Sequence, residues 1–323
     1  MLLSVVTTLY YSQAFVKPFY ERVKSTIEKL QIEEYEIIFV NDGSPDQAKQ
    51  EVLKLIAQDE RVILVDLSRN FGHHQALRTG LEQSQGEYVF LIDVDLEEAP
   101  ELLEPFWHEL QAKPHADVVY GVQQKRKGKW FERNMGKLFY QIFNYLIDLN
   151  YPADTLTARL MKRPYVEAVL QFQEREFDLW CTFLLAGFEQ IPYLTTKQSK
   201  GTSTYTLKRK IQMAIQSITA ISNKPLYYIF YLGIFITFFA FGFIIYFTIA
   251  KFIYQDVVEG WTSLVVSIWA VGGIIIFSLG IIGIYISKIF TEIKQRPISI
   301  IKKIYKRKEK TPQNNGQNFE RFE

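Results

Sequence analysis

The sequence predicts an α/β domain built on a mostly parallel sheet, followed by two membrane-spanning helices. Through about residue 120, short β-rich apolar runs alternate with amphipathic helical patterns. The apolar runs do not alternate regularly with polar residues, which is typical of strands covered by helices on both faces. Two longer apolar runs without charged residues follow at 226–250 and 261–287.

A local pattern places each element of the α/β domain. We expect strands at residues 3–8, 36–41, 62–68, 88–93 and 117–121. We expect helices at about residues 15–30, 47–58, 74–83 and 100–111. This order predicts a Rossmann-like sheet, and such sheets bind ligands at the carboxyl ends of their strands.

The two long apolar runs predict a transmembrane hairpin. Each exceeds the roughly 20 residues that an α-helix needs to cross a hydrocarbon core of about 30 Å. Residues 251–260 separate the runs, so the chain would return to the side from which it came. Residues 288–323 hold ten Lys or Arg against four Glu, and the positive-inside rule places such a tail in the cytoplasm. Buried core helices are the alternative, but they are seldom so long.

Four parts follow from this organisation. We expect a cytoplasmic catalytic domain at 1–206, an amphipathic juxtamembrane segment at 207–225, two membrane helices within 226–287, and a basic cytoplasmic tail at 288–323 with a disordered end. The protein would be a multi-pass protein of the inner membrane with both termini in the cytoplasm. Segments 133–147 and 207–221 have apolar faces at helical spacing and suit interfacial helices, although packing into the soluble core would also explain them.

An acidic pair follows the fourth predicted strand. Asp93 and Asp95 flank Val94, and an extended chain would direct both carboxylates to one side. Carboxylates that meet repel each other unless a cation neutralises them, and oxygen ligands suit Mg²⁺ or Mn²⁺ together with substrate phosphates. Glu97 is a further candidate ligand. Acidic turns and favourable first-turn acids before a helix would also explain these residues.

Other polar residues follow neighbouring strands. Asp42 and Ser44 could bind a nucleobase or ribose, or could cap the next helix. Arg69 could bind the donor or belong to a structural turn.

Two further groups of residues carry charge or ring nitrogens. Arg126 lies in the basic run 125–130 and is our candidate for anion binding, with a solvated basic loop as the alternative. His73 and His74 are more typical of packing or surface residues than of zinc ligands, because no Cys, His or acidic spacing accompanies them.

Taken together, these motifs resemble the family 2 glycosyltransferases with a GT-A fold, in the membrane-anchored branch that acts on polyprenyl phosphates. The matching segments are IIFVNDGS (37–44), LSRNFG (67–72), DVDL (93–96), VVYG (118–121), RLM (159–161) and GTSTY (201–205). The resemblance implies inverting transfer of a sugar from a UDP- or GDP-linked donor to a polyprenyl phosphate such as undecaprenyl phosphate. It also implies a Mg²⁺ or Mn²⁺ cofactor, a role in modifying cell-envelope glycans, and a homo-oligomer, with a tetramer as one form. No nucleic acid is expected as a partner.

The resemblance also implies roles for individual residues. Those implied to bind the donor are Thr8, Tyr10, Asp42, Ser44, Arg69, Asp93, Val94 and Asp95. Those implied to be catalytic are Asp93, Asp95 and Arg126, and the implied metal ligands are Asp93 and Asp95, with Glu97 as a third candidate. Those implied on the acceptor side are Arg159, Ser203 and Tyr205. The chain departs from the family pattern at Thr8–Tyr11, Asn41, Glu97 and Thr157–Ala158, and the last departure leaves no catalytic base to transfer.

Two other functions fit parts of the sequence. An enzyme that extends a lipid-linked glycan or a polysaccharide would use the same donor site, but a sugar hydroxyl needs a general base and none stands out. A lipid phosphate is already an anion and needs no base. A nucleotide-sugar-binding scaffold without turnover is the third reading, and Asp93, Asp95 and Arg126 argue against it.

Overall fold

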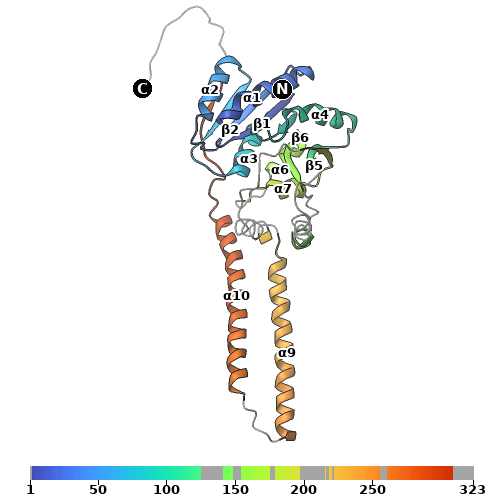
Figure 1. The fold of residues 1–323 in the computed structure, drawn as a ribbon, viewed down its shortest axis with the longest axis vertical. Coiled ribbons are helices and arrows are strands. Elements are labelled where there is room, and N and C mark those ends of the chain that lie inside the picture. Colours follow the sequence, from blue (N-terminus) through green and yellow to red (C-terminus); the bar gives the residue numbers. More distant parts are fainter. Residues whose placement is uncertain are drawn as a thin grey trace, which may run out of the picture.

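The computed structural model of the chain describes residues 2–124, 141–147, 154–174, 179–196, 215, 218–219, 222–254 and 260–307. In Figure 1 an α/β domain lies at one end of two long helices. The domain contains the N-terminal elements in chain order, and the two long helices follow it.

The described residues form one eight-stranded mixed sheet in the order β7-β5-β6-β4-β1-β2-β3-β8. The first four strands in the sequence pair in parallel, as predicted: β1 (Leu3–Leu9), β2 (Tyr35–Asn41), β3 (Val62–Leu67) and β4 (Tyr88–Leu91). On one side the sheet continues through β6 (Thr155–Lys162), β5 (Val118–Gln123) and β7 (Gln190–Thr195). Strand β6 is antiparallel to both β4 and β5, while β5 and β7 are parallel.

Helices cover both faces of the sheet, as the continuous apolar strands predict. One core holds alternate residues of β1 and β2, such as Val5 and Ile37, and packs α1 (Gln13–Lys29), α2 (Ala48–Gln58) and α4 (Leu103–Ala112). The other core holds the intervening residues, such as Val6 and Ile38. It packs α3 (His73–Gln83), α6 (Arg163–Leu170) and α7 (Leu179–Leu185). A single 3₁₀ turn, η1 (Pro100–Leu102), precedes α4.

Helices α9 (Lys224–Tyr254) and α10 (Trp261–Ile293) occupy the two predicted membrane segments. They contact each other and run side by side away from the domain (Figure 1). Within the described part of the chain, one stretch is long and apolar enough to cross a membrane, Ala270–Ile293 of α10. A hairpin in which both helices span stays a prediction.

The chain returns to the sheet after α10. Residues Ile301–Tyr305 form β8, which pairs antiparallel with β3 at the sheet edge. The amide of Ser68 donates to the carbonyl of Ile300 at 2.9 Å, and the hydroxyls of Thr79 and Ser299 lie 2.6 Å apart. The predicted basic tail therefore contributes a strand. The sheet combines strands that precede the two long helices in the sequence with one strand that follows them.

Candidate functional site

The loops after β1, β2, β3 and β4 lie at one edge of the sheet because these four strands are parallel. The three polar clusters that the sequence singled out lie in the loops after β2, β3 and β4, and Tyr10 lies in the loop after β1. The topology therefore brings most of the predicted donor-site residues to a common edge.

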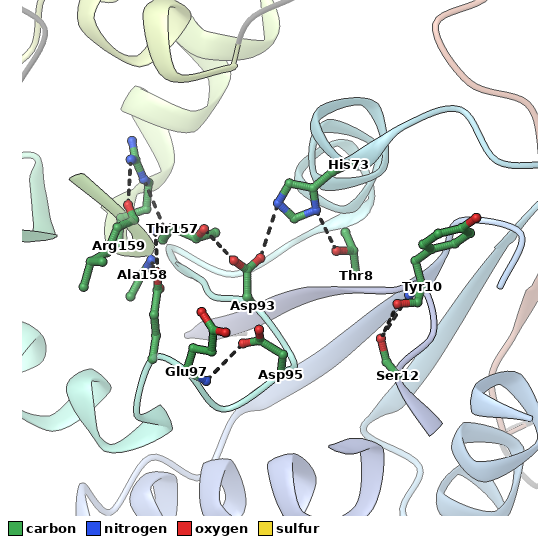
Figure 2. Close-up of polar contacts among 12 residues, drawn as sticks. Thr8, Tyr10, Ser12, His73, Asp93, Asp95, Glu97, Thr157, Ala158 and Arg159 are labelled. Carbon is green, nitrogen blue, oxygen red and sulfur yellow. Dashed lines mark hydrogen bonds and ion pairs between the residues drawn. The ribbon is translucent and has the colours of Figure 1, made fainter. Parts of the chain in front are cut away.

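Asp93 lies at the centre of a short chain of polar contacts (Figure 2). Its Oδ2 atom accepts a hydrogen bond from the hydroxyl of Thr157 at 2.7 Å. Its Oδ1 atom lies 3.4 Å from Nε2 of His73, and Nδ1 of the same ring lies 3.2 Å from the hydroxyl of Thr8. Strands β1, β4 and β6 and the start of α3 thus fix the orientation of one carboxylate.

The surroundings of Asp93 fit a cation. Its Oδ1 atom is buried and accepts no hydrogen bond from the described residues, since the contact with His73 falls outside hydrogen-bond geometry. A buried, unsatisfied carboxylate oxygen is costly unless a cation or donor meets it. No set of three His, Cys, Asp or Glu side chains in the described ranges forms a preassembled metal cluster. Mg²⁺ is commonly held by one or two carboxylates and substrate phosphates, so Asp93 with Asp95 would suffice.

We expected the acidic pair to lie in an extended strand, but it does not. Strand β4 ends at Leu91, and Asp95 lies in a turn in which its Oδ1 accepts the amide of Glu97 at 3.0 Å. In Figure 2 the carboxylate of Asp95 faces the backbone of Glu97, whereas Asp93 is turned toward His73 and Thr157. The alternation argument was therefore wrong, and a shared metal ion at Asp93 and Asp95 stays a prediction.

Glu98 fixes the other end of the acidic loop. Its side chain is 1% exposed, and its two oxygens accept the amides of Thr157 at 3.0 Å and Ala158 at 2.6 Å. This bidentate contact joins the loop after β4 to β6, so Glu98 has a structural role. Val94 is 4% exposed, and its contact with the donor stays a prediction.

Asp42 joins two loops. Its Oδ1 accepts the amide of Phe71 at 2.7 Å and its Oδ2 the amide of Gly72 at 3.1 Å, while Asn70 donates its side-chain amide to the carbonyl of Asp42. Burial raises the pKa of Asp42, and the two backbone N–H groups oppose that rise. Asp42 is neither a simple helix cap nor freely exposed to a nucleoside. Its predicted donor contact would use the lone pairs that remain.

Ser44 connects the loops after β1 and β2. Its hydroxyl accepts the amide of Tyr11 at 2.8 Å and donates to Asp46 at 2.6 Å, while its own amide donates to Asn41. Tyr10 is half exposed beside these loops, and its ring packs edge-on against Tyr11. An exposed aromatic ring at this edge offers a surface on which a base could stack.

The two described arginines of the predicted site have different environments. Arg69 is exposed, with its guanidinium 4.2 Å from the ring centre of Phe71. Arg159 is 2% exposed and packs between the rings of Trp180 and Phe183, at 4.8 and 3.7 Å from their centres. A buried arginine on aromatic rings supports the packing of α7 on β6. The acceptor-side role of Arg159 stays a prediction.

Several predicted residues lie outside the described ranges. They include Arg126, Ser203 and Tyr205, and most of the predicted interfacial segment 207–221. The described end of the other predicted interfacial segment, 141–147, is helical.

Sequence reasoning did not predict the contacts of three residues that organise the site. His73 was interpreted as a packing or surface residue, Glu98 as a possible metal ligand beside Glu97, and Thr157 only as a departure from the family pattern. His73 follows the Phe71–Gly72 pair at the strand-end loop, and that position was the available signal for it. Thr157 and Glu98 meet across about 60 positions of sequence, and no local pattern indicates that contact.

Comparison with known proteins decides the family. The family profile described as glycosyl transferase family 2 matches residues 4–170, which contain all four site loops. The chain belongs to glycosyltransferase family 2. A Mycobacterium tuberculosis protein described as a glycosyltransferase is 45% identical over 306 residues, covering 94% of this chain and 89% of that protein. A prophage-derived bactoprenol glucosyl transferase of Shigella flexneri is 29% identical, covering 95% and 99%.

Among solved structures, the mannosyltransferase of Pyrobaculum calidifontis, in complex with GDP-mannose and Mn²⁺, matches 68% of this chain and 63% of its own. Its TM-score is 0.47 and its identity is 18%.

Proposed function

We propose that this family 2 glycosyltransferase moves a sugar from a nucleotide sugar to the phosphate of a polyprenyl lipid at the cytoplasmic face of the inner membrane. One observation carries the proposal. The apolar helix α10 is joined through β8 to the same sheet whose strand ends hold the acidic loop. The name of the Shigella flexneri relative, which matches almost the whole chain, supports a bactoprenol-type acceptor.

The acceptor chemistry suits the described site. A lipid phosphate is ionised near neutral pH, so its oxygen can attack the anomeric carbon without a general base. Asp93 and Asp95 would hold Mg²⁺ or Mn²⁺, and the bound ion would neutralise charge on the departing nucleoside diphosphate. Thr157 and His73 orient Asp93, so the carboxylate is positioned before the donor arrives. We further propose that Arg126 contacts the diphosphate.

The remaining predicted contacts divide between the two substrates. We assign the donor to the loops of Thr8, Tyr10 and Ser44, and the acceptor side to Ser203 and Tyr205. Attack by the lipid phosphate on the face opposite the leaving group gives inversion. The catalytic domain and both termini would lie in the cytoplasm, and both long helices would span the bilayer.

Reconstitution tests this proposal. The purified full chain is incubated with labelled UDP- and GDP-sugars, Mg²⁺ or Mn²⁺, and undecaprenyl phosphate. We expect an acid-labile phospholipid-linked sugar. Extension of a lipid-linked glycan without that product would favour a glycan-extending enzyme. Absence of any transfer would favour a nucleotide-sugar-binding scaffold.

A matched pair of variants tests the metal assignment. Asp95→Asn removes a charge from the acidic loop and should lower transfer by about a hundredfold or more, because well-aimed electrostatic groups contribute that much. Glu33→Gln removes the same charge from an exposed segment before β2 and should leave transfer unchanged. Equal activity of the Asp95→Asn variant and the wild type would refute the metal role.

A further inference from the structure

A groove of about 260 Å³ separates the loop after β3 from the C-terminal end of α10. It lies outside the acidic loop and the Asp93 contacts, and Arg69 is the one predicted donor residue among the described residues that line it. The residues that line it are Arg69, Phe71, Gln75, Phe290, Thr291, Lys294, Arg296, Pro297 and Ile298.

The groove is cationic. Arg69, Lys294 and Arg296 line it, and none of its described lining residues carries a carboxylate. Two of the cations lie against aromatic rings: the guanidinium of Arg69 on Phe71, and the ammonium of Lys294 at 4.1 Å from the ring centre of Phe290. Ring contacts of this kind hold the side chains in place without neutralising their charge. The geometry therefore favours an anionic ligand.

The two walls of the groove are joined by the strand after α10. The contacts of Ser68 with Ile300 and of Thr79 with Ser299 hold residues 297–300 against β3 and α3. Pro297 and Ile298 lie between these contacts and the end of the helix. These contacts hold the backbone of both walls, and the exposed side chains of Arg69, Lys294 and Arg296 line the space between them.

If α10 spans the membrane as proposed, the groove lies at the membrane surface. The apolar stretch Ala270–Ile293 has 24 residues, about 36 Å of helix, which is sufficient to cross a core of about 30 Å. Lys294 follows this stretch directly, so it would lie at the level of the lipid headgroups. Phe290 is on the last turns of the same stretch and would face the acyl-chain boundary.

We propose that this groove binds the phosphate of an anionic bilayer phospholipid, separate from the site that takes the acceptor lipid. The inference rests on the proposed membrane location. Basic pockets beside a membrane helix bind anionic headgroups, and phosphate is the group that three convergent cations recognise. A phospholipid held there would fix the sheet at a set height and tilt above the bilayer, since β8 joins the groove to β3.

Native mass spectrometry of the purified full chain in detergent tests the proposal, with phosphatidylglycerol and phosphatidylcholine titrated separately and no donor present. We expect the wild type to retain phosphatidylglycerol in preference to phosphatidylcholine. Each cation near an anionic group contributes about fivefold in affinity. The variant Lys294→Gln/Arg296→Gln should therefore bind phosphatidylglycerol roughly twenty-five-fold more weakly.

The control variant Lys306→Gln/Arg307→Gln removes the same charge from exposed residues just beyond β8. It should bind phosphatidylglycerol within about twofold of the wild type, because neither residue lines the groove. Equal losses of phosphatidylglycerol affinity in the two double variants would mean that only the overall positive charge attracts the lipid, and this would overturn the proposed site. If the first double variant does not fold, Lys294→Gln and Arg296→Gln alone decide the matter, each with an expected loss of about fivefold.

A competition arm separates the bilayer lipid from the acceptor. Undecaprenyl phosphate should leave bound phosphatidylglycerol in place, and displacement of the phospholipid by it would overturn the proposal in favour of an acceptor site. Sugar transfer is measured on the same preparation. A chain that binds phosphatidylglycerol selectively but transfers no sugar would refute the proposed function and leave the groove assignment standing.

Discussion

Substituting Gly43 by alanine should destabilise the domain through one identifiable contact. Gly43 has a φ of +64°, a conformation that costs a residue with a side chain about 1 kcal/mol. A Cβ atom there would lie 2.6 Å from the backbone nitrogen of Asn70 and 2.8 Å from the backbone carbon of Arg69. Backbone atoms cannot rotate away, so the loop after β3 would have to move.

That movement would disturb the contacts that join the two loops. Asp42 accepts the amides of Phe71 and Gly72, and each such bond contributes about 1 kcal/mol net. Strain and two weakened bonds together predict a loss of about 3 kcal/mol. For a domain of this size, that corresponds to a fall in Tm of about 6–12 °C.

Gly187 supplies the matched control. Its φ is +73°, but the nearest atom to an added Cβ would be the carbonyl oxygen of Leu185 at 3.8 Å. Gly187→Ala therefore carries the conformational cost alone, about 1 kcal/mol or 2–4 °C in Tm. Thermal unfolding of both variants, followed by intrinsic fluorescence in one detergent, measures the difference. Equal falls in Tm would refute the claim that contact between the loops matters.

Two other changes test the site and the domain. His73→Ala should lower kcat for sugar transfer by about tenfold or more with Tm nearly unchanged. The reason is that Asp93 loses its neighbour at 3.4 Å, and a small misplacement of a catalytic carboxylate is costly. Steady-state kinetics, with a measurement of Tm as the control, checks this. Arg22 donates two hydrogen bonds to Glu101 and lowers the pKa of that carboxyl, so the pair stabilises the fold above about pH 4.3 and the contribution is lost as pH falls. Because both side chains are over a third exposed, Glu101→Gln should cost at most about 0.5 kcal/mol at pH 7 and less at pH 3, as denaturant unfolding at the two pH values would show.

The first half of the fold was predictable because its signals are local. Strands β1 to β5 lie within two residues of their predicted bounds, since fully buried strands give uninterrupted apolar runs between helical patterns. The end of β4 was placed too late: the chain turns at the acidic residues, and the apolar run alone does not mark that turn.

Strands β6 and β8 depend on distant pairing. Strand β6 carries Arg159 and Lys162 and lies between β4 and β5 as an antiparallel insertion. Strand β8 carries Lys302 and Lys303, which suit a sheet edge because lysines there discourage further pairing. In the sequence the same lysines indicate a solvated basic tail. These lysines lie in a strand because their segment pairs with β3, which is more than 200 residues away in the sequence.

The departure of this chain from the family pattern at Thr157–Ala158 coincides with the contacts that hold the acidic loop. Thr157 and Ala158 stand where an aspartate is common, and their amides bind both oxygens of Glu98 while the Thr157 hydroxyl binds Asp93. The two ends of the acidic loop are therefore fixed to β6 by residues that cannot act as a base. A sugar hydroxyl would need such a base, whereas an ionised lipid phosphate does not. At this position the chain orients Asp93 instead of supplying a base, and the proposed phosphate acceptor needs none there.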